Sequence, residues 1–154
     1  MVDVRTPVLP LSIAAAGFCL VGCSPKGDVD VSLRPPNEVV ISLVTDGKAL
    51  PVSSVSVESW NCRPGNRIET MWAINLDSKI ERELSEKLQK PPEVATIVYG
   101  QVPANFVVRT PAKPLQENVR YLVTAYGSPY GWGETFELRK GADGLSEVHF
   151  PCPH

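Results

Sequence analysis

Apolar and polar residues alternate along much of this sequence, and turn-forming dipeptides break the alternation repeatedly. Val29, Val31 and Leu33 alternate with polar residues, which is typical of a strand with one buried face. Asp46-Gly47 closes a continuous apolar stretch of strand length and predicts a turn. Similar signals predict strands in segments 29–33, 39–44, 54–58, 71–76, 94–99, 121–125, 136–138 and 148–150, the last two joined as a hairpin by 141–144. We therefore expect an all-β chain folded as an antiparallel β-sandwich.

The composition agrees with a single β domain and narrows the classes of partner. The chain has 154 residues, of which 43% are apolar, together with 15 prolines and 11 glycines. This composition disfavours a helical bundle, a fibre and a disordered chain. The 15 lysines and arginines do not outnumber the 17 aspartates and glutamates, so no basic excess exists to neutralise phosphates. Nucleic acid is therefore not expected as a partner.

One segment has helical periodicity. Apolar residues recur at four-residue intervals from Ile80 to Leu88, and Ser78 with Glu81 matches a capping box. These features predict a short amphipathic helix over about residues 78–89. The simplest place for it is across the open end or side of the sandwich, and binding to a partner through its apolar stripe is the alternative.

The N-terminal segment has the features of an export signal. Its apolar run from Val8 to Val21 is shorter than the roughly twenty residues of a membrane-spanning helix and suits the core of a signal peptide. The run ends in Leu20-Val21-Gly22-Cys23, which resembles the lipobox of bacterial lipoproteins. The resemblance implies that residues 1–22 are removed and that Cys23 is lipidated. An ordinary cleaved signal peptide and a buried strand are the alternatives.

The resemblance to lipoproteins also implies a location. In that family, a residue other than aspartate directly after the lipidated cysteine usually directs the protein to the outer membrane of Gram-negative cells, and Ser24 stands at that position. Residues 23–27 then form a short tether, which at roughly 3.5 Å per residue reaches less than about 20 Å. We expect the domain over residues 28–154 to lie close to the periplasmic face of the membrane.

The segment 115–126 resembles the sixth strand of fibronectin type III and related immunoglobulin-like domains. Leu115 precedes Tyr121 by six residues, as the family pattern requires. The resemblance implies that the Tyr121 ring packs into the core while its hydroxyl bonds the backbone upstream. It also implies a glycine-rich loop over 127–133 and a final hairpin strand over 134–139. It implies no function, because such sandwiches have many unrelated functions.

Two cysteines are left once Cys19 is removed with the signal peptide and Cys23 carries lipid. In an oxidising periplasm, Cys62 and Cys152 predict a disulfide. A bridge requires Cα atoms within about 7 Å of each other. Because the predicted C-terminal hairpin carries Cys152 toward the pole opposite Cys62, two free thiols are the alternative.

The sequence does not favour metal or catalytic chemistry. His149, Cys152 and His154 cluster at the C-terminus, and Cys62 would complete a ligand set. Their spacing matches no established zinc pattern, and a disulfide would use both sulfurs. The remaining sequence contains no histidine to act as the base for a serine or cysteine nucleophile. We therefore expect no catalytic residue, cofactor or metal site, and do not expect an enzyme.

Aromatic residues are the candidates for partner binding. Tyr126, Tyr130 and Trp132 fall between the last two main strands, where sandwiches carry their binding loops, and Trp60 is a further candidate. The alternative for Trp132 is that it folds back over the core, and the same alternative applies to Trp60. Trp72 is expected in the core because it occupies an inward-facing strand position.

In overall build, the sequence is similar to the small periplasmic lipoproteins proposed as immunity partners of toxins delivered by contact-dependent secretion systems. The resemblance implies a protein anchored in the membrane by its N-terminal lipid and bound to a toxin. The alternative is a structural or assembly accessory of an envelope complex. Both hypotheses describe a non-catalytic protein-binding module.

Overall fold

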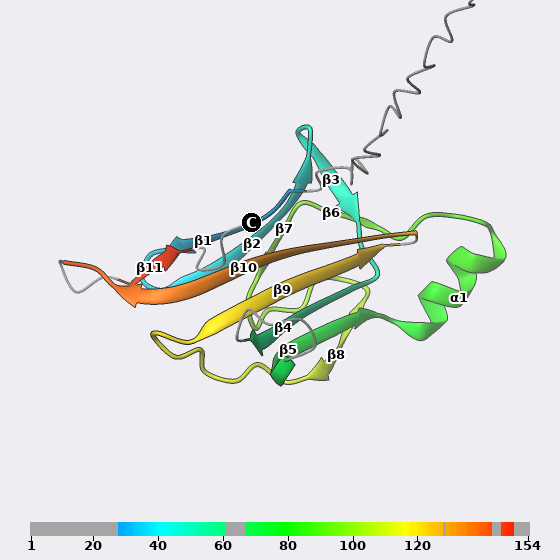
Figure 1. Ribbon diagram of the computed structural model, residues 1–154. Coiled ribbons are helices and arrows are strands. Elements are labelled where there is room, and N and C mark those ends of the chain that lie inside the picture. Colours follow the sequence, from blue (N-terminus) through cyan, green and yellow to red (C-terminus); the bar gives the residue numbers. More distant parts are fainter. Residues whose placement is uncertain (1–27, 61–66, 128, 143–145, 150–154) are drawn as a thin grey trace, which may run out of the picture.

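The computed structural model describes residues 28–60, 67–127, 129–142 and 146–149. They form two antiparallel sheets and one short helix (Figure 1), which confirms the predicted all-β sandwich. The smaller sheet contains β1 (Asp28–Arg34), β2 (Glu38–Thr45), β3 (Lys48–Pro51), β6 (Glu93–Val94) and β7 (Thr96–Val98). The larger sheet contains, in spatial order, β11 (Ser146–His149), β10 (Tyr130–Lys140), β9 (Arg120–Gly127), β4 (Ser54–Trp60), β5 (Arg67–Leu76) and β8 (Phe106–Thr110).

The predicted alternation corresponds to the inward faces of the strands. Val29 and Val31 of β1 are buried, as are Tyr121, Val123 and Ala125 of β9. Side chains from both sheets therefore form one core, because alternate residues of a strand point to the same face. The largest fully buried side chains are Trp72, Tyr121, Phe136, Ile41, Leu43, Ile74, Leu76, Val52, Val55, Val57 and Val123. Trp72 is thus a core residue, as expected.

The segment 94–99 was expected to be one strand, and this prediction is wrong in detail. The structure divides it into β6, which pairs with β3, and β7, which pairs with β2. Between them, the Ala95 carbonyl accepts a hydrogen bond of 2.8 Å from the Leu43 amide. The division arises because two different partners use neighbouring residues of the same apolar stretch. The short strands β3 and β8 were not predicted.

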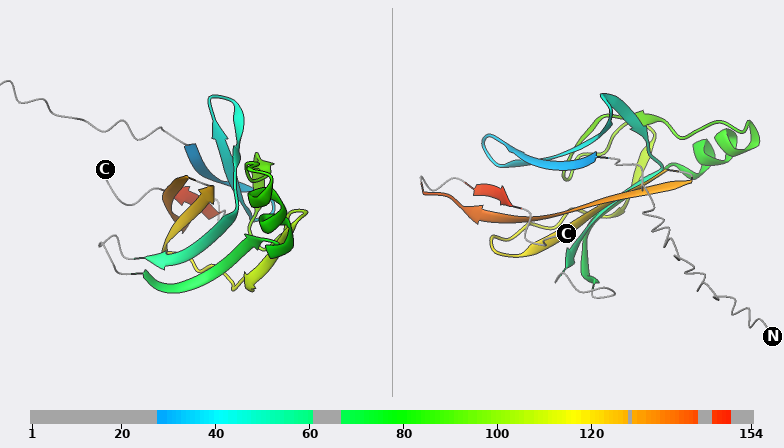
Figure 2. Two further views of the ribbon diagram at one scale, coloured as in Figure 1. Left: turned by 90° about the vertical axis from the view of Figure 1, so that its right-hand side faces the viewer. Right: turned by 45° about the horizontal axis from the view of Figure 1, so that its top comes forward.

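The helix α1 (Ser78–Glu86) ends earlier than predicted, and its N-cap is Asp77 rather than Ser78. The Asp77 carboxylate accepts a hydrogen bond of 2.9 Å from the Lys79 amide, the usual arrangement at a helix start. Leu88 lies beyond the helix with φ of 54° and is 95% exposed, so it does not extend the apolar stripe. The helix projects from one end of the sandwich, the end where β9 meets β10 (Figure 2).

Tyr121 makes the predicted contacts. Its ring is 1% exposed, and its hydroxyl oxygen accepts a hydrogen bond of 2.8 Å from the backbone amide of Gln116. Leu115 packs against the same core. Tyr121 therefore holds the chain that leads into β9 in two ways. Its ring packs in the core, and its hydroxyl bonds the backbone of Gln116.

Candidate functional site

The β9–β10 hairpin carries three of the four predicted binding residues. Gly127 pairs directly with Tyr130, so only residues 128 and 129 separate the strands. The expected glycine-rich loop is therefore wrong, because most of that stretch belongs to β9 and β10. Gly131 occupies a strand position where the Tyr126 ring takes the space of a side chain. A Cβ added to Gly131 would lie 2.9 Å from ring carbons of Tyr126.

The three aromatic residues of the hairpin do not share a face. Tyr126 lies opposite Gly131, whereas Trp132 lies opposite the fully buried Ala125. Directly opposed residues share a face of a sheet, and neighbouring residues alternate. Tyr130 and Trp132 therefore lie on the inner side of the larger sheet, with their ring centroids 6.4 Å apart. Tyr126 lies on the outer side.

Trp60 shares the outer side with Tyr126. Ser54 of β4 pairs with Tyr126, and positions 56, 58 and 60 follow it at two-residue steps along the same strand. By the same two-residue step, Trp60 falls on this face at the far end of β4 from Tyr126, next to a shift in register between β4 and β5 at Ser59 and Trp60. The structure thus divides the four predicted residues into two pairs, Tyr126 with Trp60 and Tyr130 with Trp132.

The outer face between Tyr126 and Trp60 is polar. The Ser56 and Thr124 hydroxyls are hydrogen bonded at 2.7 Å. Glu137 accepts a hydrogen bond of 2.6 Å from Arg139 Nε, and its carboxylate lies 3.6 Å from Arg120 Nε. The hydrogen bond from Arg139 holds the pKa of Glu137 below its ordinary value, although burial opposes the shift.

Arg120 and Arg139 were not among the residues predicted from the sequence to bind a partner. Their side chains are 45% and 48% exposed while they hold the largely buried carboxylate of Glu137. Their role becomes visible only once β9 and β10 are paired, because the register of these strands sets Arg120 opposite Glu137. Arginine is enriched at protein interfaces along with tyrosine and tryptophan, so these two residues belong to the candidate site.

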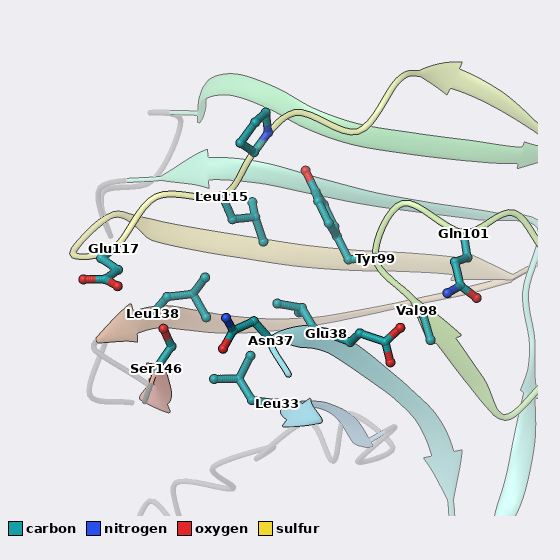
Figure 3. Close-up of a pocket in the computed structure, with 12 residues that line it drawn as sticks. Leu33, Asn37, Glu38, Val98, Tyr99, Gln101, Leu115, Glu117, Leu138 and Ser146 are labelled. Carbon is teal, nitrogen blue, oxygen red and sulfur yellow. The ribbon is translucent and has the colours of Figure 1, made fainter. Parts of the chain in front are cut away.

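A cavity of about 500 Å³ lies between the two sheets, near the ends of β1 and β10 (Figure 3). Its apolar walls and its polar rim come from both sheets and their connections. The walls include Leu33, Val39, Val98, Leu115 and Leu138, and the rim includes Asn37, Glu38, Gln101, Glu117 and Ser146. A second cavity, of about 330 Å³, lies beside α1 and is lined in part by Leu76, Leu84 and Leu88.

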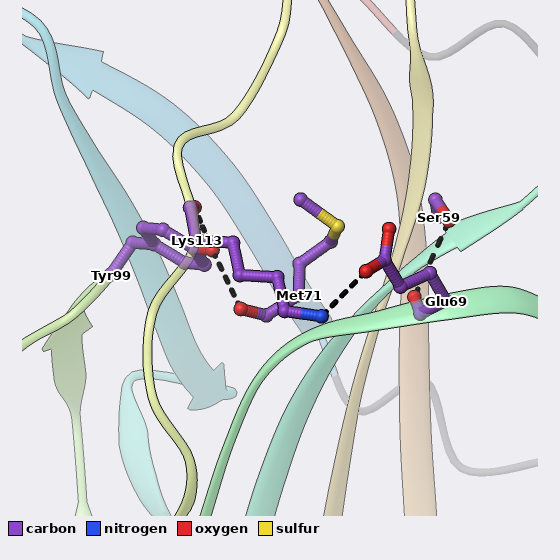
Figure 4. Close-up of polar contacts among 5 residues, drawn as sticks. All are labelled: Ser59, Glu69, Met71, Tyr99 and Lys113. Atoms are coloured by element: carbon purple, nitrogen blue, oxygen red, sulfur yellow. Dashed lines mark hydrogen bonds and ion pairs between the residues drawn. The ribbon is translucent and has the colours of Figure 1, made fainter.

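Tyr99 forms part of the first cavity wall and holds the chain that leads toward β9 (Figure 4). Its hydroxyl donates to the Lys113 carbonyl at 2.7 Å and lies 3.1 Å from the Met71 carbonyl. Lys113 in turn forms an ion pair of 2.5 Å with Glu69. Burial raises the pKa of Tyr99 to about 12, so the hydroxyl keeps its proton at neutral pH and serves as a donor to backbone.

Several predicted residues lie outside the described parts of the chain: Cys23, Cys62, Cys152 and His154. Among the residues that are described, no group of three or more His, Cys, Asp or Glu side chains is arranged to hold a metal ion. No helix in the same ranges combines the length and apolar character of a membrane span.

The chain matches no known family model, no curated protein sequence and no solved structure. The candidate site is therefore defined by the geometry of this chain alone. It consists of the outer face of the larger sheet, from Tyr126 through Arg120 and Arg139 to Trp60.

Proposed function

We propose that this protein is a membrane-anchored, non-catalytic protein-binding module whose partner contacts the outer face of the larger sheet. The observation that carries the proposal is that Trp60 and Tyr126 share this face with two half-exposed arginines, Arg120 and Arg139. Tyrosine, tryptophan and arginine dominate the energetics of protein interfaces. Tyr126 is 46% exposed and rests over Gly131, so its ring is available and supported from below.

The anchor in this proposal is lipid on Cys23, with residues 1–22 removed and residues 23–27 as a tether to the periplasmic face of the outer membrane. Two or three acyl chains suffice for stable attachment, since each buried methylene contributes about 0.8 kcal/mol. A disulfide between Cys62 and Cys152 completes the proposed mature protein. The position of β1 supports a short tether, because Asp28, the first residue of this strand, follows the proposed lipid site by five positions.

We also propose that the domain is related to immunoglobulin-like and fibronectin type III domains. Two observations support this relationship. In the larger sheet β9 pairs with β4, and in the smaller sheet β2 pairs with β7, so strands distant in the sequence lie side by side, as Greek-key connections produce in such sandwiches. The Tyr121 hydroxyl bonds the backbone of Gln116 from the start of β9, as in a tyrosine corner.

The proposed partner is a toxin, to which this protein confers immunity. The second candidate is a component of an envelope complex, for which the protein is an assembly accessory. An immunity protein forms a 1:1 complex with one toxin, and its deletion is lethal only in cells that encounter that toxin. An accessory protein instead co-purifies with envelope components, and its deletion disturbs their assembly in the absence of any toxin.

The partner face is tested by photo-crosslinking from the full-length protein in its own cells. A benzoylphenylalanine replaces Leu122 on the outer face of the larger sheet or, as the control, Asp30 on the exposed side of the smaller sheet. We expect one adduct of defined mass from position 122, lost when Tyr126→Ser is added and retained with Tyr130→Ser. An adduct from position 30 alone would contradict the proposed face.

The anchor is tested separately by fractionation. Cys23→Ala removes the acceptor thiol, so the protein should move from the membrane fraction to the soluble periplasm. A Cys19→Ala variant is the matched control, because that cysteine lies in the segment proposed to be removed. Continued membrane association of the Cys23 variant would refute the lipid anchor.

A further inference from the structure

We propose that the second aromatic pair, Tyr130 and Trp132, lies in the headgroup region of the membrane to which Cys23 is attached. This inference rests on the proposed lipid anchor and adds an orientation to it. The tip of the β9–β10 hairpin then contacts the bilayer, while the outer face of the larger sheet remains open to the partner.

The tether limits how far the domain can move from the membrane. Only residues 24–27 separate Cys23 from the start of β1 at Asp28. At roughly 3.5 Å per residue, Asp28 lies less than about 20 Å from the lipidated cysteine. Whichever surface surrounds the start of β1 is therefore held at the bilayer.

The hairpin tip belongs to that surface. Asp28 pairs with Val44, which pairs with Ala49 of β3, and β3 ends two residues later at Pro51. The Pro51 carbonyl lies close to Gly127, since a Cβ added to Gly127 would lie 1.7 Å from the carbonyl oxygen. With strands about 4.8 Å apart and about 3.3 Å per residue, this path is about 20 Å long, so Asp28 lies within about 20 Å of Gly127.

In both ribbon views β1 starts near the middle of the sandwich. The β9–β10 hairpin lies toward one end, and the ends of β1 and β10 lie toward the other end (Figures 1 and 2). The cavity lined by Leu33 and Leu138 belongs to that other end. In the proposed orientation, the hairpin faces the membrane and the 500 Å³ cavity faces away from it.

The chemistry of the pair suits a bilayer surface. Tyr130 is 54% exposed, and its ring lies beside that of Trp132, which is only partly buried against the core. Tyrosine and tryptophan are enriched at membrane interfaces because their rings are apolar while the hydroxyl or indole N–H stays hydrated. Tyr126, on the opposite face of the same hairpin, points away along the outer face of the sheet.

The test uses full-length lipidated protein, purified from membranes and reconstituted into phosphatidylcholine vesicles with bromine on the acyl chains near the headgroups. Bromine quenches a nearby indole. The chain has three tryptophans, so Trp60→Phe leaves Trp72 and Trp132 as emitters, whereas Trp132→Phe leaves Trp60 and Trp72. We expect brominated lipid to lower the emission of the Trp60→Phe protein and to leave that of the Trp132→Phe protein unchanged.

Vesicle flotation, performed first, separates failure of the anchor from failure of the orientation. Protein that floats but loses no emission in either variant would overturn the orientation and leave the anchor standing. Quenching that persists in Trp132→Phe would also overturn it, because Trp60 would then face the lipid. Protein that does not float would overturn both proposals. Tyr126→Ser, on the far side of the hairpin, should leave the quenching of Trp132 unchanged.

Discussion

The four tyrosines of this protein fall into two pairs that differ in burial and in hydrogen bonding. Tyr99 and Tyr121 form hydrogen bonds with backbone groups through their hydroxyls, and burial raises the pKa of both. Tyr126 and Tyr130, at the hairpin tip, are about half exposed. The difference follows from strand position. Tyr121 and Tyr126 are five residues apart on one strand and therefore point to opposite faces, whereas Tyr130 shares the inner side with Tyr121 but lies at the hairpin end of β10.

This comparison separates residues that hold the fold from residues that face outward. Removing a hydroxyl from an interior tyrosine leaves a backbone group in the protein without its partner. Removing an exposed ring takes away a contact with something outside the chain. Substitutions at the interior tyrosines should therefore lower the free energy of unfolding. Substitutions at the exposed tyrosines should instead weaken partner or membrane binding.

The largest expected effect concerns the support beneath the exposed tyrosines. Gly127→Ala would force a methyl group onto the Pro51 backbone, where the added Cβ lies 1.7 Å from the carbonyl oxygen. Backbone cannot move aside as a side chain can, so we expect the free energy of unfolding to fall by about 3 kcal/mol. Urea denaturation measures the change. Gly131→Ala, which meets only the mobile ring of Tyr126, is the control and should cost less than about 1 kcal/mol. Equal losses would show that the hairpin does not rest on β3.

Tyr121→Phe should have the next largest effect. The variant keeps the buried ring and removes the oxygen that accepts from the Gln116 amide. Loss of this partly buried hydrogen bond costs about 1 kcal/mol, which urea denaturation would detect. Tyr126→Phe is the matched control, since its hydroxyl lies on the exposed face. If both variants lost the same stability, the division into interior and exposed tyrosines would be wrong.

Part of this division was available from the sequence. The alternation predicted that Tyr121 shares a face with Val123 and Ala125, and the resemblance of segment 115–126 to fibronectin type III domains implied the inward ring and the hydroxyl contact. All of these predictions are confirmed. The turn at Asp46-Gly47 is confirmed as well, with φ of 50° and 74° at the two residues. These features are local, so a short stretch of sequence contains the physics that decides them.

The candidate site was less accessible to sequence analysis. Glycines at 127, 131 and 133 suggested a loop, because the sequence does not show that a neighbouring carbonyl or ring occupies the space of the missing side chains. With residues 127–133 interpreted as a loop, the sequence did not show that Tyr126 and Tyr130 lie on opposite faces of the sheet. The partnership of Arg120 with Glu137 likewise depends on a register between distant strand positions. Long-range pairing, rather than local pattern, decides which side chains share a face.

Alkaline pH should reveal Tyr99 through a smaller change in stability. Its pKa is raised from 10.0 to about 12 by burial, so the folded state favours the protonated hydroxyl. The stabilisation is complete below about pH 10, where the unfolded tyrosine is still neutral, and is lost as the pH rises toward 12. Denaturation midpoints measured across this range should therefore fall, and fall less in Tyr99→Phe. Tyr121 contributes in the same direction, so only the difference between the variant and the parent protein tests Tyr99.

The smallest expected effect on stability is at the hairpin tip. Tyr126→Ser and Tyr130→Ser each remove a ring that is about half exposed, and surface substitutions of this kind usually change the free energy of unfolding by less than about 0.5 kcal/mol. Thermal denaturation of the two variants should overlay that of the parent protein. The variants should nevertheless differ in function, because Tyr126 lies on the proposed partner face and Tyr130 on the side assigned to the membrane. A large loss of stability from either substitution would place that ring among the structural tyrosines, and the distinction between interior and exposed positions would then fail at that residue.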